Sequence, residues 1–125
     1  MRPKLPNQKQ KQTPKQQLGK AGEQRAIEFL LHKGYSILDT NFSMKFGEID
    51  IIAQDRDEIV FVEVKTRTES YGIHPSEAVD SRKLERIFQT GAYYLQWHNL
   101  NADYRCDIIT LLPETIEHFE NVSLE

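Results

Sequence analysis

The sequence predicts an α/β protein with a central mixed β-sheet flanked by helices, in the element order αβββαββ. Three observations support this class. Residues 47–53 and 59–65 are rich in β-branched side chains and alternate with period two, as strands do. Residues 18–33 and 81–97 instead repeat apolar side chains at helical spacing. The whole chain has 125 residues, which is the size of a single domain.

The first helix is predicted over residues 18–33, with Gly34 as its C-terminal stop. Glu23 shares one helical face with Ala26, Ile27 and Leu30, at spacings of three, four and seven. A carboxylate on this stripe points toward the core rather than toward water. The alternative is a first-turn glutamate that favours the helix dipole, and the helix alone does not decide between them.

The next elements are a strand over residues 35–42 and a hairpin made by the two alternating segments, with a turn at residues 55–57. A turn centred between Asp55 and Arg56 places Asp50 opposite Phe61. A turn centred one residue later places Asp50 opposite Glu63. Both registers are compatible with the sequence.

In either register Asp50, Glu63 and Lys65 lie on the same face of the sheet. Charged side chains at the end of apolar strands are unfavourable there unless they are paired or bind a metal. Two carboxylates and a lysine can bind a divalent cation and transfer a proton. The alternative is a surface hairpin with a solvated charged side, but Ile and Val on both faces suggest that both are covered.

The second half of the chain completes the sheet. Residues 66–75 form a polar loop, and residues 75–79 a short helical turn. The helix over residues 81–97 has a predicted buried stripe of Leu84, Ile87, Phe88, Gly91, Ala92 and Leu95. Two strands follow, over residues 104–112 and, as an edge strand, over residues 115–122.

Charge is unevenly distributed in a chain whose net charge is −3. Residues 1–17 form a predicted disordered tail, basic and poor in apolar residues, ahead of a single domain over residues 18–125. Such a tail can contact phosphates or can be a plain solubilising terminus. Local positive charge within the domain comes from Lys65, Arg67, Arg82, Lys83 and Arg86, and these are the candidate nucleic-acid contacts.

Several other classes are excluded or weakly supported. No apolar run is long enough for a membrane span, so we expect no membrane partner. The single Cys106 cannot form an internal disulfide, which fits a cytoplasmic protein. The four histidines lack zinc-ligand spacing, and there is no Gly-rich phosphate loop and no nucleophile elbow.

These residues, in this order, resemble the restriction-endonuclease-like nuclease superfamily, and the order of elements is similar to that of archaeal Holliday-junction resolvases. Residues 19–122 more closely resemble the YraN-like uncharacterised bacterial family. The matching stretches are residues 19–23, 47–50, 61–67 and 116–118. The motif for which the superfamily is named has a proline before the aspartate, where this chain has Ile49.

The resemblance implies metal-assisted hydrolysis of DNA phosphodiester bonds with Mg²⁺ or Mn²⁺. Asp50, Glu63 and the backbone carbonyl of Val64 are the implied ligands, with Glu23 as a direct or water-mediated one. Lys65 is expected to orient the attacking water or to stabilise the transition state. Glu48, on the same face as Asp50, is a candidate outer ligand or simply a solvated strand residue.

The sequence therefore leads to one main hypothesis and two alternatives. The main one is a metal-dependent endonuclease acting on branched or structured DNA. The alternatives are a non-catalytic nucleic-acid-binding module and an adaptor protein on a nuclease fold. DNA is the expected partner, and the sequence leaves open whether the chain acts alone or as a homodimer.

Overall fold

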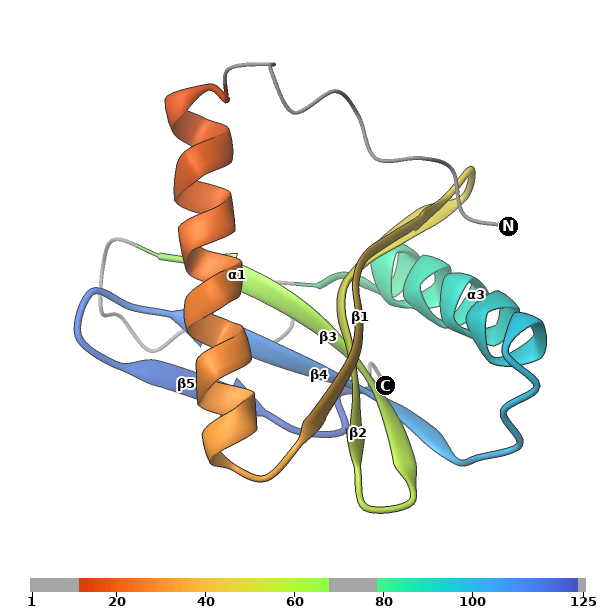
Figure 1. The fold of residues 1–125 in the computed structure, drawn as a ribbon. Helices are drawn as coiled ribbons and strands as arrows, with labels where there is room; N and C mark the ends of the chain where they lie inside the picture. The colour runs from red at the N-terminus through yellow and green to blue at the C-terminus, as the bar shows by residue number, and fades with distance from the viewer. Residues whose placement is uncertain (1–11, 68–78, 124–125) are drawn as a thin grey trace.

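The computed structural model describes residues 12–67 and 79–123, and within them the chain has the predicted order αβββαββ (Figure 1). The elements are α1 (Pro14–His32), β1 (Ser36–Met44), β2 (Gly47–Asp55), β3 (Glu58–Thr66), α3 (Ser81–Trp97), β4 (Tyr104–Leu111) and β5 (Ile116–Phe119). Most of the predicted loop and of the short helical turn after it falls on residues 68–78, outside the described residues. No helix of the described residues is long and apolar enough to cross a membrane.

The five strands form one mixed sheet in the order β1-β2-β3-β4-β5. Neighbouring strands are antiparallel except β3 and β4, which are parallel and are connected through α3. Helix α1 lies across one face of the sheet and α3 against the other (Figure 1). The predicted class, a central mixed sheet flanked by helices, is confirmed.

Helix α1 begins at Pro14, four residues before the predicted start. The predicted start was wrong because Thr13 caps the helix: its hydroxyl accepts from the Gln16 amide at 3.1 Å, and the Gln16 side chain accepts from the Thr13 amide at 2.9 Å. Proline is favourable at the first helical position, where no amide donor is needed. Of the predicted basic tail, residues 1–11 lie outside the described residues.

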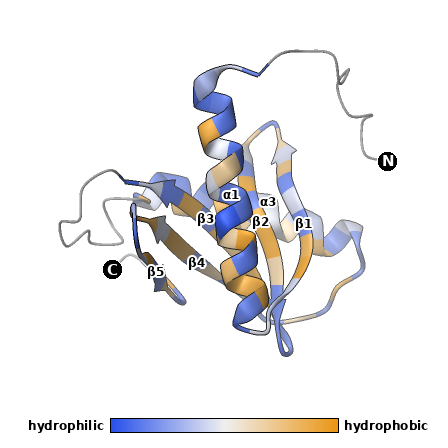
Figure 2. Ribbon diagram, turned by 60° about the vertical axis from the view of Figure 1, so that its left-hand side comes forward, coloured by the Kyte–Doolittle hydropathy of each residue, from blue (hydrophilic) through white to orange (hydrophobic). Residues whose placement is uncertain are grey.

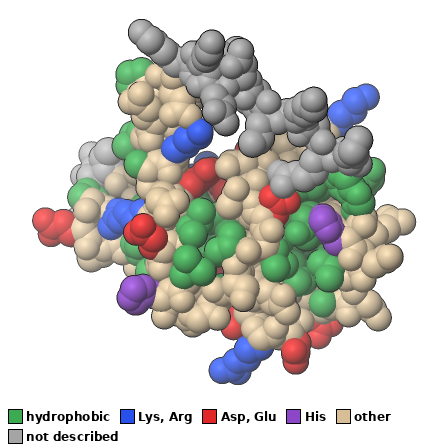
Figure 3. Space-filling model, viewed as in Figure 1, with side chains coloured by type: hydrophobic (Ala, Val, Ile, Leu, Met, Phe, Trp, Pro, Cys, Tyr) green, Lys and Arg blue, Asp and Glu red, His purple; other side chains and the backbone are tan. Residues whose placement is uncertain are grey.

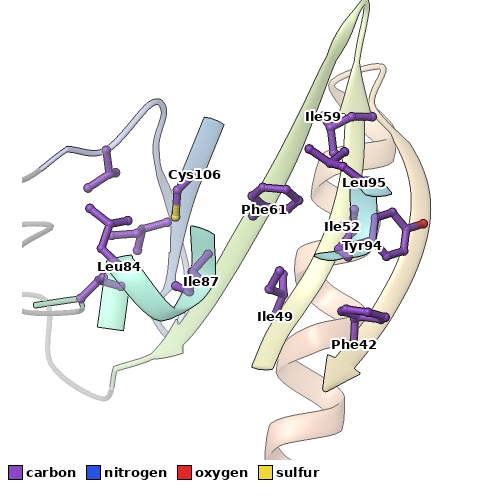
Figure 4. Close-up of a cluster of buried hydrophobic side chains, with 13 residues drawn as sticks. Phe42, Ile49, Ile52, Ile59, Phe61, Leu84, Ile87, Tyr94, Leu95 and Cys106 are labelled. Carbon is purple, nitrogen blue, oxygen red and sulfur yellow. The ribbon is translucent and has the colours of Figure 1, made fainter. Parts of the chain in front are cut away.

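Both faces of the sheet are buried, as the alternation in β3 predicts. Ile59 and Phe61 belong to the core under α3 (Figure 4), whereas Val60 and Val62 belong to the core under α1. The three central strands are accordingly the most hydrophobic part of the ribbon (Figure 2). Charged residues on β3 are therefore held beside a packed core rather than on a wet surface.

The β2–β3 hairpin adopts the second of the two predicted registers. Asp55 pairs with Glu58 across a two-residue turn, and Arg56 there has a positive φ of 57°. Continuing this register places Asp50 opposite Glu63. The regular pairing, however, ends one position earlier, at Ile51 and Val62.

Helix α3 has the predicted bounds, but its buried stripe differs in detail. Ala92 is exposed, and Thr90 and Tyr94 are buried instead. Gly91 explains this, because α3 packs so closely on β3 there that a β-carbon at this position would overlap the Phe61 ring. The helix face that contains Gly91, with Thr90, Tyr94 and Leu95, therefore packs against the sheet.

Replacing Gly91 tests this close packing. Gly91→Ala should lower the free energy of unfolding by about 1–3 kcal/mol, because the buried Phe61 ring cannot move aside without disturbing the core. Urea denaturation measures the change.

The matched control is Gly19→Ala in α1, where a β-carbon would meet nothing within 4 Å. This change should raise stability by up to about 1 kcal/mol through helix propensity alone. Equal effects of the two substitutions would show that α3 does not need a glycine at its contact with β3.

Candidate functional site

The site begins where β2 and β3 stop pairing. The Ile59 amide donates to Asp103, just before β4, and the Arg67 amide donates to Leu111 of β4. Odd-numbered residues of β3 therefore direct their backbone groups toward β4. Val64 has the opposite parity and directs its backbone toward β2. There its amide donates to Asp50 Oδ2 at 2.8 Å rather than to a β2 carbonyl. A side chain thus replaces backbone pairing, and the Val64 carbonyl lies along the same opened edge.

The opening brings Asp50 and Glu63 together. Glu63 is a buried carboxylate on the α3 side of β3, and Asp50 reaches it from β2. Burial, followed by the negative charge of Glu63, raises the pKa of Asp50 to about 6. Burial and the charge of Asp50 also raise the pKa of the more exposed Glu48. The site therefore concentrates negative charge that favours a cation or a proton.

Two lysines offset this charge. Lys83 Nζ, from the first turn of α3, lies 2.6 Å from Glu63 Oε1, and Lys65 Nζ lies 3.8 Å from the same atom. Burial, followed by the charge of Lys83, lowers the pKa of Lys65. Burial opposes the charge of Lys83 as well, but its hydrogen bond to Glu63 and the attraction of that carboxylate raise its pKa overall. Lys83 is thus the cation that Glu63 holds most closely.

A pocket of about 550 Å³ connects these strands to the N-terminus of α3. Its lining residues are Gly47, Glu48, Asp50, Glu63, Asp80, Arg82, Lys83, Arg86 and Ile87. Three of the predicted nucleic-acid contacts, those on α3, therefore border the carboxylates. Arg67 does not line the pocket, because it continues β3 alongside β4. Lys65 reaches the site through its contact with Glu63.

Glu23 approaches from α1, on the other side of the sheet. Its Oε1 accepts a hydrogen bond from Asn41 Nδ2 at 3.1 Å. Burial raises the pKa of Glu23 despite that bond, and the charge of Asp50 raises it further. The two carboxylates are thus within electrostatic range, but Glu23 is held by β1 rather than by the strands that carry the pair.

The oxygen donors of the site are of the kind that bind a divalent cation. Among residues 12–67 and 79–123, no group of three or more His, Cys, Asp or Glu is placed to hold one ion. The pair Asp50 and Glu63, with the Val64 carbonyl, offers oxygen donors of the type that Mg²⁺ and Mn²⁺ accept. Glu63 already holds a positive charge, the Lys83 ammonium. The chemistry of these three donors fits a cation.

Sequence reasoning missed the contact of Lys83 with Glu63, because it joins two elements twenty residues apart and depends on how α3 packs. It also missed Thr110, which pairs with Lys65 in the β3–β4 register and lies on the same face as Ile108. Among the described residues, Thr110 Oγ1 is a buried oxygen without a hydrogen-bond partner. This oxygen could accept a hydrogen bond from Lys65 or from a water.

A second charged cluster on β4 was also missed. Arg105 and Asp107 are buried and hydrogen-bonded at 3.0 Å, and Asp107 also contacts His118 Nε2 at 2.8 Å. Arg105 further binds the side chains of Tyr35, Asp55, Glu58 and Glu120. The hydrogen bonds of His118 and Arg105 lower the pKa of Asp107 even though burial opposes this. The cluster joins β5 and the β2–β3 turn to β4, which is a structural role.

Comparisons with known proteins agree with this architecture. Residues 22–111 match the model of the uncharacterised protein family UPF0102. A UPF0102 protein of Thermotoga petrophila is 43% identical over 105 residues, covering 84% of this chain and 95% of its own. One from Clostridioides difficile strain 630 is 43% identical over 106 residues, covering 82% and 93%.

A solved structure is similar in fold. Hjc of Archaeoglobus fulgidus, a Holliday junction resolvase, superposes with a TM-score of 0.54 at 16% identity, covering 82% of this chain and 76% of its own. Together with the mixed sheet, this likeness shows the restriction-endonuclease-like fold that the sequence predicted.

The raised pKa of Asp50 predicts a pH-dependent stability in EDTA. Because the folded state holds this proton more tightly than the unfolded chain, Asp50 stabilises the fold fully below its ordinary pKa of 3.8. That contribution is lost as the pH rises through about 6. Asp50→Asn should flatten this fall and be more stable than the wild type at about pH 7.5, by about 1–3 kcal/mol.

Urea denaturation across this pH range measures the effect. The control is Glu114→Gln, which changes an exposed carboxylate between β4 and β5 and should keep the wild-type slope. If Asp50→Asn also kept that slope, Asp50 would not share its environment with Glu63 in the way the structure places it.

Proposed function

The chain belongs to the uncharacterised protein family UPF0102, and from the geometry of its site we propose that it is a metal-dependent endonuclease that hydrolyses phosphodiester bonds of DNA. One observation carries the proposal. The end of the β2–β3 hairpin opens, and the opening holds Asp50, Glu63 and Lys65 together beside a pocket bordered by the cationic start of α3. Oxygen donors, a lysine and phosphate-binding cations are the components that phosphodiester hydrolysis requires.

Asp50 and Glu63 would hold Mg²⁺ or Mn²⁺, together with the Val64 carbonyl. The bound ion would polarise the scissile phosphate and stabilise the charge that develops on it. The hydrogen bond from the Val64 amide fixes Asp50 Oδ2 and leaves its other oxygen for a ligand. Glu23, whose Oε1 accepts a hydrogen bond from Asn41, would act through its other oxygen as a direct ligand or through a water.

Lys65 would orient the attacking water or stabilise the transition state. It lies beside Glu63, and burial together with the neighbouring Lys83 lowers its pKa, which eases the exchange of a proton. Lys83, which contacts Glu63 Oε1, would leave that oxygen when the cation binds there. Its ammonium would then be available to the phosphate.

Arg82 and Arg86 line the pocket and would contact the DNA backbone without reading its sequence. The net charge of −3 makes such local positive charge necessary for DNA to approach. The similarity in fold to Hjc, a Holliday junction resolvase, supports branched DNA as the first substrate to test.

Cleavage is tested directly with labelled duplex, single-stranded, flap and four-way-junction DNA in Mg²⁺ or Mn²⁺. The wild type should cleave at least one branched substrate, and EDTA should stop the reaction. Asp50→Asn and Lys65→Gln should each lower the single-turnover rate by about a hundredfold or more, since each removes a group acting on the reacting phosphate or water.

The variants should keep DNA binding, measured by fluorescence anisotropy, and should unfold cooperatively. Lys15→Gln, which removes a lysine from the exposed first turn of α1, is the matched control and should cleave normally. If the wild type binds these DNAs but cleaves none of them, the chain is a binding module. If Lys65→Gln cleaves at the wild-type rate, Lys65 has no role in the reaction.

Competition between Lys83 and the cation gives a separate prediction. Lys83→Gln should increase the affinity for Mn²⁺ by about fivefold, because it removes an ion pair worth about 1 kcal/mol that holds Glu63 Oε1. Calorimetric titration without DNA measures this change.

The matched control is Arg86→Gln, which removes one positive charge from the same pocket but not from that contact. This control corrects for the change in the electrostatic potential of the pocket that the loss of any one positive charge causes. An equal gain in both variants would mean that Glu63 is not a cation ligand.

A further inference from the structure

Three exposed aromatic side chains form a continuous surface that the proposed hydrolysis does not use. Phe46, at the β1–β2 turn, meets Tyr93 of α3 with ring centroids 6.4 Å apart, and Tyr93 meets Trp97 at 6.1 Å. Their exposed fractions are 40%, 45% and 41%. We call these three residues the aromatic stripe. Large apolar rings exposed singly are ordinary, but a contiguous set marks an interaction surface.

The aromatic stripe is continuous with the pocket of the candidate site. Phe46 is followed by Gly47, which lines the pocket and packs so closely on α3 that a β-carbon there would lie 2.6 Å from Thr90 Oγ1. Arg82, Arg86, Tyr93 and Trp97 are separated by four, seven and four residues, which places them along one face of α3. This face therefore runs from pocket-lining arginines to exposed rings.

The charge along this face suits a nucleic acid. Arg82 and Arg86 are exposed at the pocket, and Lys45 is exposed beside Phe46. Glu85, the single carboxylate within α3, lies to one side of the face, and the carboxylates of the pocket (Glu48, Asp50, Glu63 and Asp80) lie outside this face. Hydrophobic side chains also reach the surface over β1 and α3 in the space-filling view (Figure 3). A cationic groove combined with aromatic rings is the arrangement that binds single-stranded nucleic acid, because every base can stack on a ring.

We propose that the aromatic stripe binds unpaired nucleotides of a DNA strand that enters the pocket. Arg82 and Arg86 contact the phosphates nearest the site, and the exposed rings contact successive bases. This rests on the proposed nuclease function and narrows its substrate to DNA with an unpaired segment beside the point of cleavage, such as a fork or a flap. Intact duplex gives the rings no accessible base face.

Trp97 is the only tryptophan of the chain, so it reports on this surface directly. The full chain, in EDTA, is titrated with an oligothymidylate of about 15 nucleotides and with a duplex of the same length. Stacking should quench the Trp97 fluorescence with the single strand and leave it nearly unchanged with the duplex. An oligothymidylate that binds, as anisotropy reports, without changing this fluorescence would overturn the proposal.

Substitutions test the same surface with a labelled fork as the probe. Tyr93→Ala should weaken binding to the fork by about tenfold and leave duplex binding within about twofold of the wild type. Trp97→Phe, which keeps a ring, should bind nearly normally, whereas Trp97→Ala should not. The control Tyr104→Ala removes an exposed ring outside the stripe. It should change the affinities for the fork and for the duplex by the same factor. Equal losses for both DNAs in Tyr93→Ala would contradict base stacking.

The outcomes separate this proposal from the nuclease proposal. Binding is measured in EDTA and does not depend on cleavage. A protein that cleaves no DNA but prefers the fork to the duplex through Tyr93 would support the stripe proposal and contradict the nuclease proposal. An active protein in which Tyr93→Ala weakens fork and duplex binding equally would contradict the stripe proposal and leave the nuclease proposal standing. Sedimentation provides a further check: a wild-type dimer that Trp97→Ala converts to a monomer would identify the stripe as an interface between two copies and overturn the proposal.

Discussion

The candidate site depends on one hydrogen bond, from the Val64 amide to Asp50 Oδ2, at the point where β2 and β3 stop pairing. Had the ladder continued by one position, backbone carbonyls would have used the β3 donors and closed the edge. The carboxylate satisfies the amide in their place, as a buried donor requires. It also turns Asp50 toward Glu63 and leaves the Val64 carbonyl at the opened edge. Strand divergence and carboxylate placement are therefore one structural feature.

The electrostatic balance around Glu63 follows from that opening. Asp50 and Glu63 repel each other in a partly buried place, and Lys65 and Lys83 offset the repulsion without removing it, since the pKa of Asp50 remains raised to about 6. A fold selected only for stability would not gather these charges, because apolar residues could fill the same space. Carboxylates whose pKa is raised in this way, beside the cationic first turns of α3, are characteristic of functional sites. The Arg105 cluster on β4 differs, because each of its carboxylates is hydrogen-bonded to the same buried guanidinium.

Local patterns were sufficient to predict the element order and the positions of the site strands. Alternation in β3 correctly indicated two covered faces, and it placed Glu63 and Lys65 on one of them. The register needed the structure, because a turn at Arg56 could be centred in two ways. The partner of Glu63 also needed it, since only the packing of α3 brings Lys83 there. Arg105 and Asp107 were not identified from the sequence. Their spacing of two within an apolar strand is the same as that of Glu63 and Lys65, which were identified.

Crystals grown with MnCl₂ would show whether the opened end of the hairpin is a cation site. An anomalous difference map should show a peak in contact with oxygens of Asp50 and Glu63 and with the Val64 carbonyl, and Lys83 should have moved away from Glu63. The Mn²⁺ concentration should exceed the dissociation constant measured in solution. A map without a peak there, in which Lys83 still contacts Glu63, would mean that the opened end of the hairpin is not a cation site.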